Sequence, residues 1–233
     1  MKFVLSQKVS EAMSGGGFVG ALIYGSQRLG KSSYAAQILY DIYGDWDVVN
    51  QHILFELSDV VKMLRLALKE RRKIPAMVWD DAGIHANKLL YFQNRTLVQY
   101  LQNLLDVVGL YLGGLLITTP SPNNLLRAIR GYEWYRVKIY QRDKYNGRMA
   151  VGYQSILLPS GSRLIKRVFK DNYNVHLPEV FWQPYLVKRQ GYLEAGIDNL
   201  ERLLELHHPM MDAGPEGAGL EGEIDTILAG KQL

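Results

Sequence analysis

The sequence predicts an α/β fold with a mainly parallel sheet, extended by an antiparallel β-meander and a C-terminal helical segment. Apolar runs at 18–25, 74–83 and 113–122 show little polar alternation, which is typical of strands buried on both faces. Helical patterns separate these runs, so right-handed crossovers are expected to keep the strands parallel. After about residue 132, polar residues alternate with apolar ones, which indicates antiparallel strands with one exposed face.

The elements follow in a regular order. The strand at 18–25 precedes a loop and a helix over 31–44, which Gly44 is expected to end. A strand is expected over 47–57 and a helix with an apolar stripe over 59–73. The strand at 74–83 is followed by a longer helix over 94–112 and by the strand at 113–122.

The meander is expected over 132–169. Asn146-Gly147 predicts a type I′ hairpin turn, and the residues 159–162, PSGS, predict a second turn. A helical segment with proline breaks is expected over 171–208, and the Gly-rich, acidic stretch at 209–233 is expected to be a flexible tail. Residues 1–17 form a separate N-terminal segment in this prediction, and 18–170 form the main domain.

Composition limits the chemistry. The chain has 233 residues, a formal net charge of +4 and no cysteine, which excludes disulfides, zinc-thiolate sites and cysteine nucleophiles. A mildly basic charge permits a polyanionic partner without requiring one. The sequence contains no run of about 18 apolar residues and its start is a poor signal peptide, so we expect no membrane span and a cytoplasmic location.

Residues 25–32 read GSQRLGKS and match the pattern G-x-x-x-x-G-K-[ST] at every fixed position. Glycines let a backbone wrap a phosphate with its N–H groups pointing inward, and the next helix offers its N-terminus to the same anion. Lys31 is then expected to reach the β- and γ-phosphates, and the Ser32 hydroxyl to ligate Mg²⁺. The alternative is a glycine-rich turn with a solvated lysine. The residues expected to bind ATP are Gly25, Ser26, Gln27, Arg28, Leu29, Gly30, Lys31, Ser32 and Ser33.

This loop resembles the Walker A motif of the P-loop NTPases, and two further segments extend the resemblance. In "VWDDAG", Asp80 is similar to the family's Walker B aspartate, which helps to hold Mg²⁺. Asp81 stands where the branch with an additional catalytic strand (the ASCE division) carries a glutamate, and it is expected to polarise the attacking water. The shorter aspartate departs from that pattern. The alternative is an acidic turn between strand and loop.

The segment "LLITTPSPNN" provides a third point of resemblance. In additional-strand ATPases, a strand beside Walker B ends in a polar residue that senses the γ-phosphate. Thr118 or Thr119 could serve, and Thr119 is taken as the expected catalytic residue, although two β-formers at a strand end would look the same.

An arginine often neutralises charge on the γ-phosphate during hydrolysis. Arg28, Arg127 and Arg130 are the candidates, acting within the chain or from a neighbouring subunit, and a solvated basic helix end is the alternative. His85 is the histidine that would be tested, because it follows the two aspartates closely.

Basic and aromatic residues alternate through the meander. Such a pattern can track a phosphate backbone and stack on bases, or it can be the solvated face of an antiparallel sheet. The basic members are Arg136, Lys138, Arg142, Lys144, Arg148, Arg163, Lys166, Arg167 and Lys170, and the aromatic members are Tyr132, Trp134, Tyr135, Tyr140, Tyr145 and Tyr153.

Together the three segments resemble DNA-packaging motors, FtsK/HerA-like and zonula-occludens-toxin-like ATPases, and small ATPases of archaeal viruses and plasmids. The resemblance covers about residues 18–140 and implies a Mg²⁺-dependent ATPase that moves or remodels DNA, assembled as an oligomer or ring; for a viral protein the location would be the host cytoplasm. A nucleotide-switched replication initiator or loader is the alternative from another class. A small-molecule kinase is the third hypothesis, and no acceptor-site motif supports it.

Overall fold

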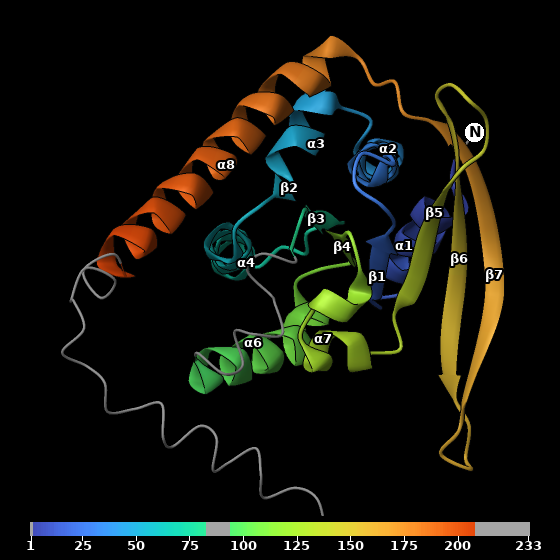
Figure 1. Cartoon of the computed structure of the whole chain (residues 1–233). Coiled ribbons are helices and arrows are strands. Elements are labelled where there is room, and N and C mark those ends of the chain that lie inside the picture. The colour runs from blue at the N-terminus through green and yellow to red at the C-terminus, as the bar shows by residue number, and fades with distance from the viewer. Residues whose placement is uncertain (1, 83–93, 208–233) are drawn as a thin grey trace, which may run out of the picture. The chain divides into compact units, whose positions relative to one another are not determined.

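The computed structural model describes residues 2–82 and 94–207 (Figure 1). The chain divides into two units, residues 1–186 and 187–233. The first unit contains the whole sheet, and of the second the structure describes a helix from Val187 to His207. The expected flexible tail at 209–233 and His85 lie outside the described residues.

Seven strands form one sheet in the order β2-β3-β4-β1-β5-β6-β7. The five strands from β2 to β5 in this order pair in parallel, and β6 and β7 continue the sheet antiparallel. This arrangement confirms the predicted fold class. The bounds are β1 Val19–Tyr24, β2 Ile53–Leu54, β3 Met77–Trp79, β4 Gly114–Thr119, β5 Tyr135–Gln141, β6 Gly147–Leu157 and β7 Arg163–Asn174.

Helices cover both faces of the central strands (Figure 1). On one face α1 (Val4–Ser14) packs on β1 and β7, and α2 (Lys31–Tyr43) packs on β1, β3 and β4. On the other face, α4 (Leu57–Glu70) and α6 (Arg95–Val107) bury Leu64 and Leu101 against Trp79 and Ile117. The shorter elements are α3 Trp46–Gln51, α7 Arg127–Gly131 and the 3₁₀ turns Val108–Leu110 and Pro122–Asn124; α8 spans Glu179–His207.

The strand expected over 47–57 is wrong for its first half. Residues Trp46–Gln51 form α3, and only Ile53–Leu54 pair as a strand. Asp45 explains the difference, since its side chain accepts hydrogen bonds from the Asp47 and Val48 amides and so caps the helix at its start.

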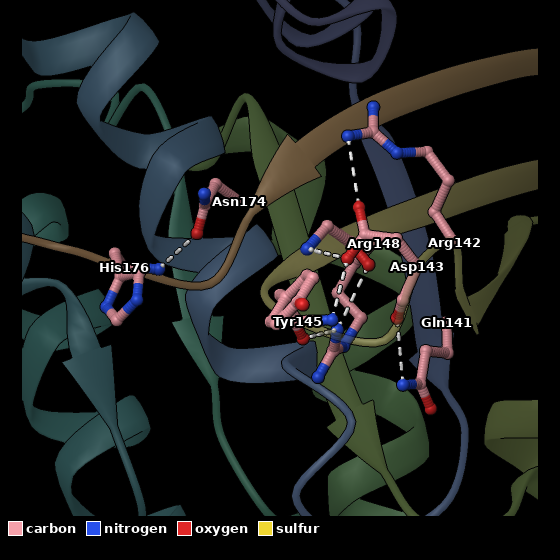
Figure 2. Close-up of polar contacts among 8 residues, drawn as sticks. Gln141, Arg142, Asp143, Tyr145, Arg148, Asn174 and His176 are labelled. Carbon is pink, nitrogen blue, oxygen red and sulfur yellow. Dashed lines mark hydrogen bonds and ion pairs between the residues drawn. The ribbon is translucent and has the colours of Figure 1, made fainter.

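The type I′ turn expected at Asn146-Gly147 is also wrong, because neither residue has the positive φ that this turn requires. Residues 142–146 form a longer connection instead. The Asp143 carboxylate closes it by accepting from the Tyr145 and Gly147 amides, each at 3.0 Å (Figure 2). The turn expected at 159–162 is present, with Gly161 at φ +78°.

The C-terminal helix also differs from expectation, because α8 continues through Pro184 without a break. None of the helices in the two described ranges, 2–82 and 94–207, is long and apolar enough to cross a membrane.

Candidate phosphate- and metal-binding site

The loop between β1 and α2 bends sharply at Gly30. Gly30 has φ +94° and ψ +22° and directly precedes α2, a backbone conformation that costs an L side chain strain. A Cβ atom at this position would lie 2.6 Å from Val175 Cγ1. Glycine is therefore required here both by the backbone angle and by the space available.

Lys31 begins α2 and is turned back toward the loop. Its Nζ donates to the carbonyl oxygens of Gly25, at 3.1 Å, and Ser26, at 3.0 Å. The residue is buried, whereas Ser26, Gln27 and Arg28 are exposed. The ammonium group is thus bound to carbonyl groups at the start of the loop, while the middle of the loop is exposed to solvent.

Asp80 stands at the end of β3 and is fully buried. Its Oδ1 accepts from Ser32 Oγ at 3.0 Å and from Thr118 Oγ1 at 2.5 Å, and its Oδ2 accepts from Tyr185 Oη at 2.7 Å. Three hydroxyl groups from α2, β4 and α8 therefore converge on one carboxylate.

Thr118 connects both aspartates. β4 lies between β1 and β3 in the sheet, and its Thr118 hydroxyl also accepts from the Asp81 amide at 2.9 Å. Asp81 itself has φ +50°, which is uncommon for a residue other than glycine. Thr119, which the sequence analysis had taken as the expected sensor, donates to the Ser121 carbonyl at 3.0 Å, so the hydroxyl that meets Asp80 is that of Thr118.

Two side chains from β6 and β7 of the meander form hydrogen bonds with the loop. Arg148 Nε donates to the Leu29 carbonyl at 3.2 Å, and Tyr173 Oη donates to the Gly30 carbonyl at 3.0 Å. Figure 2 shows the other end of the Arg148 guanidinium bound within the β5–β6 connection, where Nη1 donates to the Tyr145 and Gly147 carbonyls. Burial raises the pKa of the Tyr173 phenol, so this hydroxyl stays a donor at physiological pH.

Sequence reasoning missed the supporting roles of Arg148, Tyr173 and Tyr185. Arg148 had been grouped with the basic residues that could face DNA. The loop carbonyls that Arg148 and Tyr173 meet lie 119 and 143 residues away in sequence, so no local pattern marks these contacts.

The remaining expected site residues are more dispersed. Ser33 is buried in the first turn of α2. Arg127 is exposed and Arg130 is half-buried on α7. Within the described part of the chain, neither arginine makes a hydrogen bond or ion pair with the loop or with Asp80.

The donor set at Ser32 and Asp80 fits a magnesium–phosphate group. Mg²⁺ prefers oxygen ligands and is usually held by one or two carboxylates, with substrate phosphates and waters completing its shell. A hydroxyl and a carboxylate oxygen lie 3.0 Å apart here. The N-terminus of the thirteen-residue helix α2 and the Lys31 ammonium lie beside them, and both favour an anion.

A second polar surface lies on β5, β6 and β7. Arg136, Tyr153 and Arg167 are directly opposite one another across the three strands, and so are Lys138, Val151 and Lys170. Residues opposite each other share a face, which also carries Tyr140 opposite Met149. We call this set the basic face: Arg136, Lys138, Tyr140, Tyr153, Arg167 and Lys170.

The basic face lies beside β1. Tyr24, at the end of β1, is opposite Lys138 in the parallel pairing of β1 with β5. Burial raises the pKa of the Tyr24 phenol, and Lys138 and Arg136 oppose this effect. On the opposite face, β7 packs on α1, where the Val4 amide donates to Asp171 Oδ1 at 3.0 Å. Trp134 belongs to the core and not to either exposed surface.

No protein-family model matches the chain. Among curated proteins it is 26% identical over 238 residues to the uncharacterized protein B-251 of Sulfolobus spindle-shape virus 1, covering 96% of this chain and 93% of that protein. It is 28% identical over 165 residues to the uncharacterized protein ORF286 of Acidianus two-tailed virus, covering 70% of this chain and 58% of that protein.

Two solved structures are similar in part. The KaiC-like protein PH0186 from Pyrococcus horikoshii matches 66% of this chain and 92% of its own, with 16% identity and a TM-score of 0.35. The genome packaging NTPase B204 from Sulfolobus turreted icosahedral virus 2, in complex with ATPγS, matches 65% of this chain and 98% of its own, with 14% identity and a TM-score of 0.35.

Proposed function

We propose that the chain is a Mg²⁺-dependent ATPase of the P-loop type with an additional catalytic strand, and that it acts on DNA. The observation that carries the proposal is the contact between the start of α2, which carries Lys31 and Ser32, and the carboxylate that follows β3. There Ser32 Oγ lies 3.0 Å from Asp80 Oδ1. The expected ATPase part, residues 18–170, needs correction at both ends, because β7 extends to Asn174, α8 begins only at Glu179, and α1 of the expected N-terminal segment 1–17 packs on β1 and β7.

In this proposal the loop binds the triphosphate. The amides around Gly30 and the N-terminus of α2 face the phosphate oxygens, and Lys31 exchanges the Gly25 and Ser26 carbonyls for those oxygens. Ser32 and Asp80 hold the metal site, and magnesium supplies charge neutralisation on the β- and γ-phosphates when it is bound.

Hydrolysis needs a group that orients water. Asp81 is the proposed base, because its backbone is fixed to Thr118 and its side chain is one position beyond Asp80. Thr118 is the polar strand end that the geometry favours as a γ-phosphate sensor, with Thr119 as the alternative. Arg127 or Arg130 is proposed to act on a neighbouring subunit, which requires an oligomer and is compatible with a ring.

The proposed contact with DNA is the basic face. Its cations and tyrosines are arranged in rows on adjacent strands, as expected for a surface that follows a phosphate backbone and stacks on bases. β1 lies beside this face and leads directly into the loop, so the two proposed sites share one strand. The viral origin of the two curated relatives is compatible with an activity on viral DNA, such as packaging.

The test is ATP turnover at low salt with and without DNA. We expect DNA to stimulate turnover, Lys31→Ala to abolish nucleotide binding, and Asp81→Asn to bind ATP while losing turnover. If the rate of ATP turnover is the same with and without DNA and the chain self-associates on binding nucleotide, the chain would be a nucleotide-switched loader and the translocase proposal would be wrong. An unchanged ATP affinity in Lys31→Ala would overturn the ATPase proposal itself.

A further inference from the structure

The Tyr185 hydroxyl donates to the carboxylate oxygen of Asp80 that Ser32 and Thr118 leave untouched. We propose that Tyr185 is a positioning residue for Asp80 and couples the metal–nucleotide site to the first two turns of α8. This inference rests on the proposed function, because it assigns Asp80 to the metal site. Tyr185 lies 105 residues from Asp80 in the chain.

The Tyr185 side chain has little freedom to move independently of α8. The residue is 1% exposed, and its ring stacks on Phe181 at a centroid distance of 5.4 Å and also contacts Phe55 and Trp182. The Asn50 side chain donates to the Phe181 carbonyl at 3.2 Å. The start of α8 is thus anchored to the end of α3 and to the segment after β2, and the phenol moves only with this anchored segment.

Asp80 has a matching restriction. The carboxylate is fully buried, so its oxygens need hydrogen-bond partners within the protein, and the three hydroxyl groups provide them. Binding of a metal ion beside Ser32 changes the partners of Oδ1, since Ser32 Oγ is itself the proposed ligand. The bond at Oδ2 then either holds the carboxylate in place or transmits its displacement to Tyr185. In the second case the occupancy of the site and the position of the first two turns of α8 are linked.

A purely structural hydrogen bond would predict a loss of stability and nothing more. Tyr43 provides the matched control, because it is a partly buried tyrosine whose hydroxyl donates to the Ala76 carbonyl at 2.6 Å. Tyr43→Phe and Tyr185→Phe each delete one hydroxyl and keep the ring, but only the second touches Asp80.

The experiment measures binding of a fluorescent ATP analogue to the full chain with and without Mg²⁺. Tyr185→Phe is expected to keep the Mg²⁺-free affinity and to weaken the Mg²⁺-dependent affinity by about ten- to a hundredfold, as expected for a hydrogen bond to a charged group. Tyr43→Phe is expected to leave both affinities within about twofold. Equal effects of the two substitutions, or an unchanged Mg²⁺ dependence in Tyr185→Phe, would overturn the inference.

Hydrogen exchange of the wild-type chain gives a second readout that needs no variant. We expect Mg²⁺–ATPγS, but not ATPγS with a chelator, to change amide exchange over residues 181–186. No change there in a chain that binds Mg²⁺–ATPγS would reject the coupling while leaving the proposed function intact. Absence of any nucleotide binding by the wild type would instead reject the proposed function.

Discussion

Gly30 shows how a single residue can join the loop to the meander. Its positive φ gives α2 its starting direction, and the absence of a Cβ lets Val175 and the Tyr173 hydroxyl approach from β7 and the residue after it. Gly44 at the other end of α2 also has a positive φ, +73°, but nothing lies within 4 Å of the position of its Cβ. An added Cβ would therefore meet both backbone strain and a steric clash at Gly30, but backbone strain alone at Gly44.

We expect Gly30→Ala to lower the free energy of unfolding by about 2–5 kcal/mol, which combines the left-handed backbone and an overpacked neighbour. Gly44→Ala should cost only the backbone part, about 1–2 kcal/mol. Denaturant unfolding measures both. If both variants lower the free energy of unfolding equally, Val175 moves aside freely and its close approach to Gly30 does not affect stability.

At the scale of the elements, the β5–β6 connection is closed by one carboxylate. Hydrogen bonds from the Gly147 and Tyr145 amides and from Arg142 lower the pKa of Asp143 below its ordinary value of 3.8 (Figure 2). A lowered folded-state pKa means that the charged carboxylate stabilises the connection above the ordinary pKa. This contribution is lost as the pH falls through the lowered value.

We therefore expect the Tyr145 and Gly147 amides to become more mobile only as the pH falls through the lowered pKa of Asp143, below its ordinary value of 3.8. NMR shifts and exchange rates of these two amides follow the transition directly. Asp143→Asn supplies the control, since its side chain does not titrate and the same amides should stay constant over that range. A pH response that persists in the variant would assign the transition to another group.

Arg148 joins this connection to the loop through its hydrogen bond to the Leu29 carbonyl, so in the proposed function β6 supports nucleotide binding without facing the nucleotide. We expect Arg148→Met to weaken ATP binding by about three- to tenfold, because the Leu29 carbonyl loses its donor while the apolar stem is kept. DNA affinity should change little. A variant that loses DNA affinity and keeps ATP affinity would place Arg148 on the DNA-binding surface after all.

The elements also show which parts of the molecule a sequence can predict. Apolar runs predicted β1, β3 and β4, and the glycine–lysine spacing predicted the loop, because these signals are local. Asp45 was a local signal as well, and its helix cap was overlooked in favour of the apolar residues after it. Tyr185, Arg148 and Tyr173 could not be predicted, since their partners are set by the folding of distant segments.

On the scale of the whole first unit, one sheet carries both proposed activities. The proposed phosphate-binding loop follows β1, the paired acids follow β3, and the basic face begins at β5, which pairs with β1. The loop therefore follows β1 directly and contacts β6 and β7 through Arg148 and Tyr173. The antiparallel strands thus form an extension that contacts the loop directly.

The basic face can be tested by the salt dependence of DNA binding. Lys138 and Lys170 are exposed and flank Val151 on this face, and each phosphate contact contributes about 0.9 to the slope of log affinity against log salt for duplex DNA. Lys138→Ala with Lys170→Ala should reduce that slope by up to about 1.8 and leave ATP binding intact. Arg65→Ala with Lys69→Ala removes two exposed cations from α4 and serves as the control of equal charge. If both double variants reduce the slope equally, DNA is attracted by net charge alone and the basic face is not its binding surface.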